Sequence, residues 1–328
     1  MAPQETLLRA IQDYPGSNNP SSFLAMNEGN CVFVAPGLPG AVAYRAAGDH
    51  LVQFGGPFAP EEAYEPLLAA FEAFAVEEDR RLVAVQLQGQ DARRYARRGW
   101  TVNQVGASYA VELAGFSLAG TRFMRLRNKI SRAHRAGLVV QEADLAQWRE
   151  AMADLDRQWL GSKGEHARQL EFLVGQYGGA AQRHRRLFVG LLGGRLAGYI
   201  SYSPVYGDRP GWMHDLSRRR PDAAPGLMEA INRTAMAHFR DEGAAWLHFG
   251  FTPFTGLDSG VEQPGHSPGF ACFMRLLWEY GEAVYPARTQ LAYKEKWAPQ
   301  VVLPEYVAFR GPATLTGFAH VFRACNAF

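Results

Sequence analysis

The sequence predicts an α/β protein in which two modules of one plan follow each other along the chain. Its 328 residues exceed the roughly 100–200 residues of a usual single core, so two packed units are expected. Short apolar runs alternate with amphipathic helical stretches, which is typical of sheets covered by helices. The Gly-containing stretch Ala114–Gly120 separates two regions with a similar order of elements.

The first region, residues 1–118, is expected to form a mixed sheet flanked by helices. After an opening helix, runs that are punctuated by Pro and Gly predict strands. Leu67, Leu68, Phe71 and Phe74 recur at helical spacing and predict a helix after Pro60. The predicted elements are strands Cys31–Ala35, Ala41–Arg45 and His50–Phe54, helix Glu61–Glu78, strand Leu82–Leu87, helix Asp91–Arg98, and strands Trp100–Gln104 and Ala107–Leu113.

The second region, residues 119–328, repeats a meander of strands followed by helix, strand, helix and a tail that carries lysines. The predicted elements are helices Arg122–Ala136 and Leu145–Leu160, strands Arg186–Leu192, Leu196–Tyr202 and Trp212–Ser217, helix Gly226–Arg240, strand Ala245–Phe249 and helix Phe270–Tyr280. The shared plan, without a close sequence repeat, predicts two tandem acetyltransferase-like modules of the GNAT type.

Composition limits the class of protein. With 47% hydrophobic and 20% charged residues, the chain is typical of a folded globular protein. No run approaches the ~18 apolar residues of a membrane-spanning helix, and the N-terminus lacks the pattern of a signal peptide, so we expect a cytoplasmic protein without an integral membrane segment. Cys31, Cys272 and Cys325 are far apart and odd in number, so neither a disulfide framework nor a cysteine-rich zinc site is expected.

Polar residues gather where a predicted strand ends and a helix begins. Asp215 and Arg218 lie at the end of the strand, and Glu229 lies in the first turn of the helix that Gly226 opens. Ligands bind at such carboxyl ends in open α/β sheets, and a helix N-terminus accepts an anion or a developing oxyanion. The same spacing also fits an acid that only partners the helix dipole and arginines that only face solvent.

Two basic features stand apart from the rest of the chain. It has four lysines against thirty arginines, and Lys294 and Lys296 are two of the four; an ammonium group pairs with phosphate or a carbonyl oxygen. The helix after the linker places several basic residues on one face, which fits a nucleic-acid backbone or a solvated surface equally well. These basic residues are Arg122, Arg125, Lys129, Arg132 and Arg135.

Familiar catalytic motifs are absent from the sequence. There is no G-x-S-x-G, no HExxH, no Walker loop and no G-x-G-x-x-G after a strand. The pyrophosphate loop of coenzyme-A acetyltransferases would fall at Arg220–Gly226, but this segment lacks the first glycine and carries Asp222. An acetyl-CoA donor is therefore disfavoured, and no bound cofactor is expected.

At these same residues the sequence resembles the C-terminal catalytic domain family of the phosphatidylglycerol lysyl- and alanyltransferases. Short motifs in the family's order carry the resemblance, which covers most of the chain. They are Trp159-Leu160 with Lys163 and Glu165, similar to W-L-x-x-K; Asp215–Arg218, Pro221–Ala223 and Gly226–Glu229, similar to D-L-M-R, P-D-A-P and G-x-M; Phe249–Leu257, similar to L-G-M-A-P-L; and Tyr293–Pro299 with Pro304–Tyr306, similar to F-K-x-K-F-x-P and P-R-Y.

The resemblance implies a tandem acetyltransferase-like fold and transfer of an amino acid from aminoacyl-tRNA to an acceptor. It implies that Asp215 or Glu229 acts as a base or binds the α-ammonium group of the donor. Arg218 would contact the oxyanion or a ribose phosphate, and Lys294 with Lys296 would contact donor phosphates and the leaving oxygen. The basic helix would carry the acceptor stem of the tRNA, with no metal required.

Departures from the family pattern leave the acceptor open. The membrane-embedded region of the family is missing here, Glu305 stands where the family usually has Arg, and Phe54–Pro57 replaces a G-D-P. The leading expectation is an aminoacyl-tRNA-dependent transferase that acts on an amine or hydroxyl of a soluble small molecule in specialised biosynthesis. The alternatives are a peripheral enzyme acting on a phosphatidylglycerol-type lipid, an acyl-CoA-dependent N-acyltransferase, and a non-catalytic RNA-binding module.

Overall fold

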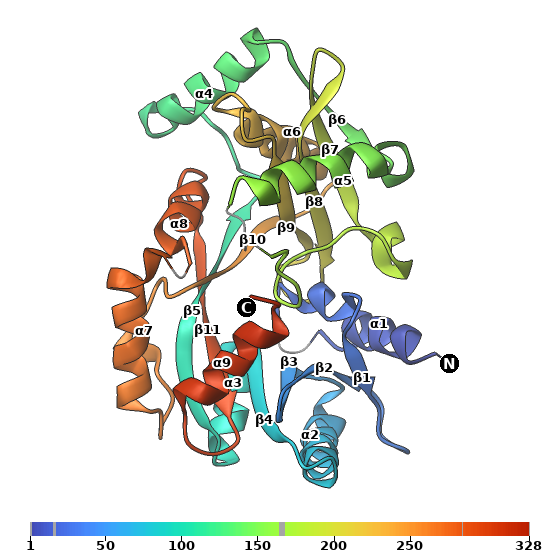
Figure 1. Ribbon diagram of the computed structural model, residues 1–328, viewed down its shortest axis with the longest axis vertical. Coiled ribbons are helices and arrows are strands. Elements are labelled where there is room, and N and C mark those ends of the chain that lie inside the picture. Colours follow the sequence, from blue (N-terminus) through green and yellow to red (C-terminus); the bar gives the residue numbers. More distant parts are fainter. Residues whose placement is uncertain (1, 16–17, 164–167, 284, 328) are drawn as a thin grey trace.

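A single mixed sheet runs through both halves of the chain. The computed structural model describes residues 2–15, 18–163, 168–283 and 285–327. Within these residues, eleven strands pair in the order β1-β2-β3-β4-β11-β5-β10-β9-β8-β7-β6. Helices lie along the sheet from end to end, with α4, α5 and α6 beside the strands of the second half and α2 and α9 beside those of the first (Figure 1).

The first half follows the predicted order of elements. Its helices and strands are α1 Pro3–Asp13, β1 Cys31–Phe33, β2 Ala41–Ala47, β3 His50–Phe58, α2 Glu61–Glu77, β4 Arg81–Leu87, α3 Gly89–Arg97 and β5 Thr101–Glu112. The predicted strands Trp100–Gln104 and Ala107–Leu113 are in fact one strand, β5. It stays continuous through Gly106 because a register shift between Glu305 and Tyr306 of its neighbour accommodates the irregularity.

The second half contains more elements than the sequence predicts. Its helices and strands are α4 Met124–Arg135, β6 Leu138–Ala143, α5 Leu145–Gly161, β7 Arg186–Leu192, β8 Arg195–Val205, β9 Gly211–Arg219, α6 Leu227–Asp241, β10 Trp246–Pro253, α7 Pro268–Tyr280, α8 Ala287–Glu295, β11 Val301–Phe309 and α9 Leu315–Ala324. Four of these, β6, α8, β11 and α9, have no predicted counterpart. In β11 the reason is Pro304, which argues against a central strand but here pairs with Ala107.

Each half contains one pair of parallel strands joined by a helix. β3 pairs in parallel with β4 across α2, and β9 pairs in parallel with β10 across α6; the other strand pairs are antiparallel. A parallel pair needs a crossover connection, and an amphipathic helix provides one that also covers the sheet. The recurrence of this unit confirms the predicted α/β plan of two similar modules with mixed sheets flanked by helices.

The two halves exchange a strand. β11 lies between β4 and β5 of the first half, and β5 in turn pairs with β10 of the second half. Glu305 of β11 is thereby completely buried and accepts a hydrogen bond from Ser108 of β5. The division at residues 118 and 119 stays a prediction, since the pairing of the sheet crosses it in both directions.

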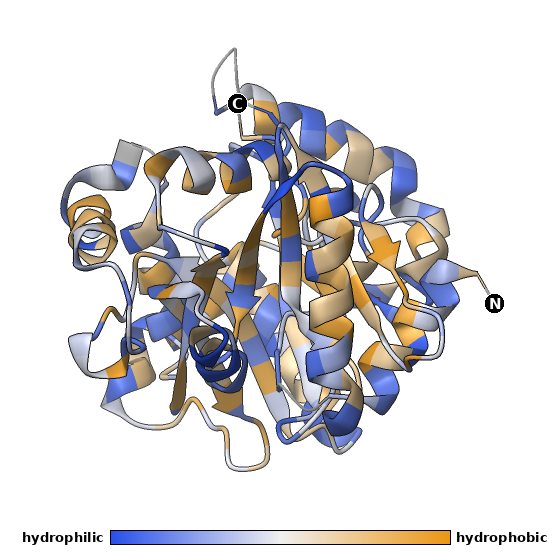
Figure 2. Cartoon of the chain, turned by 90° about the horizontal axis from the view of Figure 1, so that it is seen from below, coloured by the Kyte–Doolittle hydropathy of each residue, from blue (hydrophilic) through white to orange (hydrophobic). Residues whose placement is uncertain are grey.

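Alternating side chains of the strands enter different cores. In β2, Ala41 and Ala43 pack with α1 and α9 residues, whereas Val42 between them packs with α2 residues on the other face. In Figure 2, hydrophobic and hydrophilic residues alternate along the covering helices, as expected of helices that bury one face. Among the described helices, none has the length and hydropathy needed to cross a membrane.

Candidate active site

The site lies where β9 and β10 part. These strands pair only from Gly211 to Met213 and from Trp246 to His248. After a register shift that follows His248, β10 continues along β5 while β9 continues along β8. A cavity of about 930 Å³ lies where the strands part. It is lined by the residues of both strands that come after their paired stretch and by the first turn of α6. The five predicted catalytic residues Asp215, Arg218, Glu229, Lys294 and Lys296 all line it.

Asp215 is a buried carboxylate on the cavity wall. Its side chain is completely buried, and its Oδ2 lies 3.8 Å from Nε of Arg185, which is equally buried. Burial raises the pKa of Asp215 to about 6, although the charge of Arg185 opposes the shift. Neither carboxylate oxygen accepts a well-aligned hydrogen bond from the part of the chain that the structure describes, although the hydroxyls of Ser201 and Ser203 lie near enough to favour its charged form. A cationic or hydrogen-donating ligand would therefore find a ready acceptor here.

Arg185 is a residue that the sequence gives no reason to select, because it stands among several surface arginines. Its Nη2 donates to Oδ1 of Asn27 at 3.1 Å, and its guanidinium lies 5.2 Å from the centre of the Phe23 ring. These contacts come from the first half of the chain. They hold a positive charge beside Asp215 and so make the carboxylate less costly to bury.

The segment 168–175 covers Asp215 from the other side. The N–H of Gly175 donates to the backbone oxygen of Asp215 at 3.0 Å, and residues Arg168, Leu170, Leu173 and Val174 of this segment line the cavity. A side chain at Gly175 would come within 2.6 Å of Cγ and of the backbone oxygen of Asp215. Glycine is thus required there by close approach.

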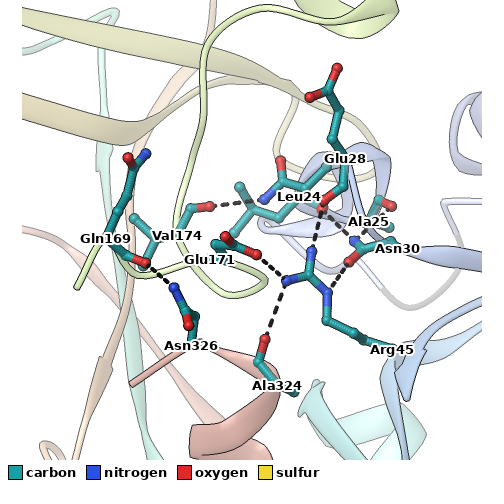
Figure 3. A network of polar contacts seen from close by, with 11 residues as sticks. Leu24, Ala25, Glu28, Asn30, Arg45, Gln169, Glu171, Val174, Ala324 and Asn326 are labelled. Atoms are coloured by element: carbon teal, nitrogen blue, oxygen red, sulfur yellow. Dashed lines mark hydrogen bonds and ion pairs between the residues drawn. The ribbon is translucent and has the colours of Figure 1, made fainter. Parts of the chain in front are cut away.

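Arg45 fastens this segment to the first half of the chain (Figure 3). Its guanidinium donates to Glu171 at 2.8 Å, to the backbone oxygen of Ala324 at 3.3 Å, to that of Glu28 at 2.8 Å and to Asn30 at 3.0 Å. One half-buried cation therefore joins β2, the end of α9 and the segment that lines the cavity.

Glu229 is held between two lysines. Its Oε1 lies 3.0 Å from Nζ of Lys296 and 3.8 Å from Nζ of Lys129, and only 8% of its side chain is exposed. Lys129 belongs to α4, the predicted tRNA-binding helix, and it lines the same cavity. The first turn of α6, the end of α8 and the basic helix thus meet at one carboxylate.

Close backbone packing seats the basic helix on α6. Gly226, with a φ of 96°, precedes α6, and a Cβ there would lie 2.2 Å from the backbone oxygen of Lys129. Leu126, Ile130 and Ala133 of α4 are buried, whereas its predicted tRNA-binding residues are exposed. Of those residues, Arg122 lies in the turn before α4, and the others, Arg125, Lys129, Arg132 and Arg135, lie in α4. Among them, only Lys129 lines the cavity, and their contact with tRNA stays a prediction.

Arg218 is oriented by stacking. Its guanidinium carbon lies 4.0 Å from the centre of the Trp159 ring, and its Nη1 donates to the backbone oxygen of Ser217 at 2.9 Å. Burial lowers the pKa of Arg218, and the nearby Tyr199 and Asp156 oppose that shift. Stacking fixes the plane of the guanidinium, which favours directed contacts with a planar or anionic group.

Lys294 compensates for the parting of the strands. Its Nζ donates to the backbone oxygens of Gly250 at 2.8 Å and Phe251 at 3.1 Å, just after the register shift in β10. Burial lowers the pKa of Lys294 to about 7, opposed by the charge of Glu305. An amine with two N–H groups occupied can present either a third N–H or, when neutral, its lone pair.

His214 is a further cavity residue to which the sequence assigns no role. Its Nδ1 is buried and has no hydrogen-bond partner in the described residues, and its ring lies 5.8 Å from that of Tyr293. Burial and the charge of Lys294 lower the pKa of His214 to about 3. The imidazole is therefore neutral and can accept a hydrogen bond.

The W-L-x-x-K segment also reaches the cavity. Trp159, Leu160 and Lys163 line it, and Nζ of Lys163 lies 5.2 Å from the centre of the Trp159 ring. Glu165, which the sequence groups with them, lies outside the described residues. In the described lining, seven Lys or Arg side chains face two carboxylates, so the cavity is strongly basic. The seven are Lys129, Lys163, Arg168, Arg218, Arg219, Lys294 and Lys296.

Comparisons with known proteins show which family the chain resembles. A family model described as phosphatidylglycerol lysyltransferase, C-terminal, matches residues 9–309. Phosphatidylglycerol lysyltransferase of Bacillus subtilis is 23% identical over 90% of this chain and 33% of its own length. The lysylphosphatidylglycerol biosynthesis bifunctional protein LysX of Rhodococcus opacus is 22% identical over 90% of this chain and 27% of its own length. The chain therefore spans a third or less of these relatives.

A solved structure shares the fold over almost the whole chain. The structure of L-PGS from Bacillus licheniformis superposes with a TM-score of 0.79 at 19% identity, covering 99% of this chain and 97% of the other. The overall fold of the chain is thus found in a second protein.

The contact between Gly175 and Asp215 generates a prediction about stability. Gly175→Ala should lower the free energy of unfolding by about 1–3 kcal/mol, because the added Cβ meets backbone and Cγ atoms that cannot turn away. Denaturant unfolding measures the change. Gly115→Ala is the matched control, since its Cβ meets no atom within 4 Å, and it should stay within about 0.5 kcal/mol. Equal effects of both substitutions would contradict the described contact.

Proposed function

Because the chain belongs to the phosphatidylglycerol lysyltransferase C-terminal family, we propose that it transfers an aminoacyl group from aminoacyl-tRNA to a hydroxyl of phosphatidylglycerol. The observation that carries the proposal is the basic cavity at the parting of β9 and β10, which collects the five residues selected by the family's motifs. Its size suits an aminoacyl ester and the head group of a lipid better than a single small metabolite.

The acceptor differs from the leading expectation of the sequence. A soluble small-molecule acceptor finds no support among the relatives, whose names specify phosphatidylglycerol. The lipid alternative is therefore the better supported one, and the basic cavity suits the phosphodiester of such a lipid. The names of these relatives also specify a lysyl group, which makes lysyl-tRNA the first donor to test.

The reaction is an exchange of one ester for another. The acceptor hydroxyl oxygen attacks the ester carbonyl of the donor, a tetrahedral oxyanion forms, and the ribose oxygen of the tRNA leaves. The proton of the acceptor hydroxyl ends on the ribose oxygen. This reaction requires a proton acceptor near the hydroxyl, hydrogen-bond donors near the oxyanion and positive charge near the phosphates. It requires no cofactor.

Asp215 is the better of the two predicted acids for accepting a proton or an α-ammonium group. Its oxygens accept no well-aligned hydrogen bond in the described structure, with only the hydroxyls of Ser201 and Ser203 nearby, and its raised pKa of about 6 makes it a stronger base than an ordinary carboxylate. Glu229 already contacts Lys296 and Lys129, so its charge is largely balanced. We assign Glu229 to holding the two lysines at the cavity wall.

The cationic groups divide the remaining tasks. Arg218, fixed on Trp159, is placed to contact the oxyanion or a phosphate. Lys296 and Lys129 bind phosphate oxygens of the donor, and the exposed residues of α4 continue this basic surface toward the tRNA. Lys294 acts beside the reacting atoms. Its remaining N–H donates to the leaving oxygen, or its lone pair relays the proton to that oxygen.

The proposed function is tested with radiolabelled aminoacyl-tRNA. A pool of charged tRNAs is incubated with the protein and with vesicles of phosphatidylglycerol in phosphatidylcholine, and label is followed into the organic phase. We expect lipid-borne label that requires phosphatidylglycerol and disappears when ribonuclease is added first. Label that enters only water-soluble products would move the acceptor to a small molecule. Activity with an acyl-CoA in place of tRNA would refute the donor.

The role of Asp215 predicts a pH dependence. Only its carboxylate form accepts a proton or binds an ammonium group, so kcat/KM should rise as the pH increases through about 6 and fall below it. Asp215→Asn should lose that rise and lower kcat/KM by about 10²-fold or more. Asp241→Asn, at an exposed carboxylate on α6, serves as the control and should keep the wild-type profile. An unchanged profile in Asp215→Asn would remove Asp215 from the mechanism.

The exposed face of α4 predicts a salt-dependent contribution to tRNA binding. Replacing Arg122, Arg125 and Arg132 together by Ala should raise the KM for aminoacyl-tRNA about 10-fold or more with little change in kcat. The slope of log binding constant against log salt should shrink by about 2, since each phosphate contact contributes roughly 0.7–0.9. Steady-state kinetics measures KM and kcat, and filter binding at several salt concentrations measures the slope. The matched control removes three exposed arginines elsewhere, Arg9, Arg157 and Arg195; an equal loss there would show that only net charge matters.

A further inference from the structure

Three ligand-type side chains meet at a second place in the molecule, away from the cavity. Asp49 and His50 lie at the turn between β2 and β3, and His320 lies in α9. Oδ1 of Asp49 is 2.8 Å from Nδ1 of His50 and 3.0 Å from Nε2 of His320. The two imidazole rings are stacked, with centres 4.2 Å apart. None of the three residues belongs to the described lining of the cavity.

The cluster has the chemistry of a transition-metal site. One ligand atom from each residue lies within 4.8 Å of those of the other two. Both histidines are at least nine-tenths buried, and Nδ1 of His320 has no hydrogen-bond partner within the described chain. Through such a free ring nitrogen a neutral imidazole binds a metal ion. The side chain of Asp49 is 60% exposed, which leaves a path for an ion and a solvent ligand.

We propose that Asp49, His50 and His320 bind a divalent cation of the zinc class, with water as the fourth ligand. Bonds of about 2.0–2.1 Å around a tetrahedral ion place ligand atoms roughly 3.4 Å apart. The observed contacts of 2.8 and 3.0 Å are a few tenths of an ångström shorter, so the ion replaces the shared protons after the cluster opens. At least one of the stacked rings must also turn, because an ion lies close to the plane of each imidazole that binds it. Two imidazoles favour zinc, nickel, cobalt or copper over magnesium or calcium, which prefer oxygen ligands.

The arginines around the cluster make the carboxylate of Asp49 essential for binding a cation. Arg80 donates to the backbone oxygen of Gly48, Arg81 lies close enough to His50 to affect its pKa, and the side chain of Arg323 approaches Gly48. These arginines repel a cation, and Asp49 is the only anionic ligand of the three. Removing the charge of Asp49 while keeping its shape therefore tests the site directly.

A bound ion would connect the turn between β2 and β3 to α9. The residues that follow α9 already hold the segment that lines the cavity. The backbone oxygen of Cys325 accepts a hydrogen bond from the N–H of Glu171 at 3.0 Å, and the side-chain amide of Asn326 donates to the backbone oxygen of Gln169 at 3.1 Å. Occupancy should thus stabilise the packing of α9 and the segment behind it. This consequence does not depend on the proposed transfer reaction.

Metal titration of the full chain tests the proposal. After chelator treatment and dialysis, Zn²⁺ is added and binding is followed by calorimetry, with Co²⁺ absorption as a second probe. We expect one ion per chain with micromolar or tighter affinity, a higher Tm, and a Co²⁺ spectrum without thiolate bands, measured in a chain with Cys31→Ser and Cys272→Ser because both thiols are exposed. Asp49→Asn and His320→Gln should each weaken binding about 100-fold or more.

His134→Gln removes an exposed histidine outside the cluster and should bind the ion like the wild type. Circular dichroism shows which variants are folded. Because the side chain of Asp49 is exposed, Asp49→Asn should fold and still test the site if His320→Gln does not fold. Wild-type affinity in folded Asp49→Asn would overturn the proposal. Binding that requires millimolar Zn²⁺ would overturn it as well, leaving a hydrogen-bonded cluster without a metal.

Discussion

The site depends on how far two parallel strands stay together. β9 and β10 are joined by α6 and begin side by side, but their pairing ends after three residues of each strand. The backbone beyond that point must find other partners, because buried peptide groups without hydrogen bonds are costly. β10 finds them in β5 and in the ammonium group of Lys294, whereas β9 finds them in β8. The space between the diverging strands is the cavity.

Two charged residues of the cavity wall, Asp215 and Lys294, have buried partners of opposite charge behind the wall. Asp215 with Arg185 and Lys294 with Glu305 are deeply buried, and each pair lacks the direct, well-aligned contacts that would make burial inexpensive. Burial raises the pKa of Glu305 to about 8 and lowers that of Lys294 to about 7, so this pair can exist with little net charge near neutral pH. Groups of this kind are retained at ligand sites because a substrate completes their contacts.

The sequence predicts the order of elements where local pattern and tertiary role agree. Helix α2, with Leu67, Leu68 and Phe71 on one face, and strand β7 have nearly the predicted bounds. The local pattern fails where distant contacts decide the secondary structure. Pro304 lies in a central strand because its missing N–H is tolerated opposite Ala107. Helix α8 carries little hydrophobic periodicity because it packs through Lys294 as well as through apolar residues. The gathering of the five site residues at one cavity could be predicted from motif order, whereas their roles stay predictions. Arg185 and His214 could not be selected, since an Arg in a run of basic residues or a single His shows its burial only in three dimensions.

The place of β11 also governs how the chain must fold. β4 and β5 are close in sequence, yet between them lies a strand made of residues 301–309, near the far end of the described chain. Until that strand arrives, the first half exposes two unsatisfied strand edges, which are sticky toward other chains. Contacts of such sequence separation slow folding. During synthesis, the first half of the sheet can therefore close only after residues 301–309 have been made.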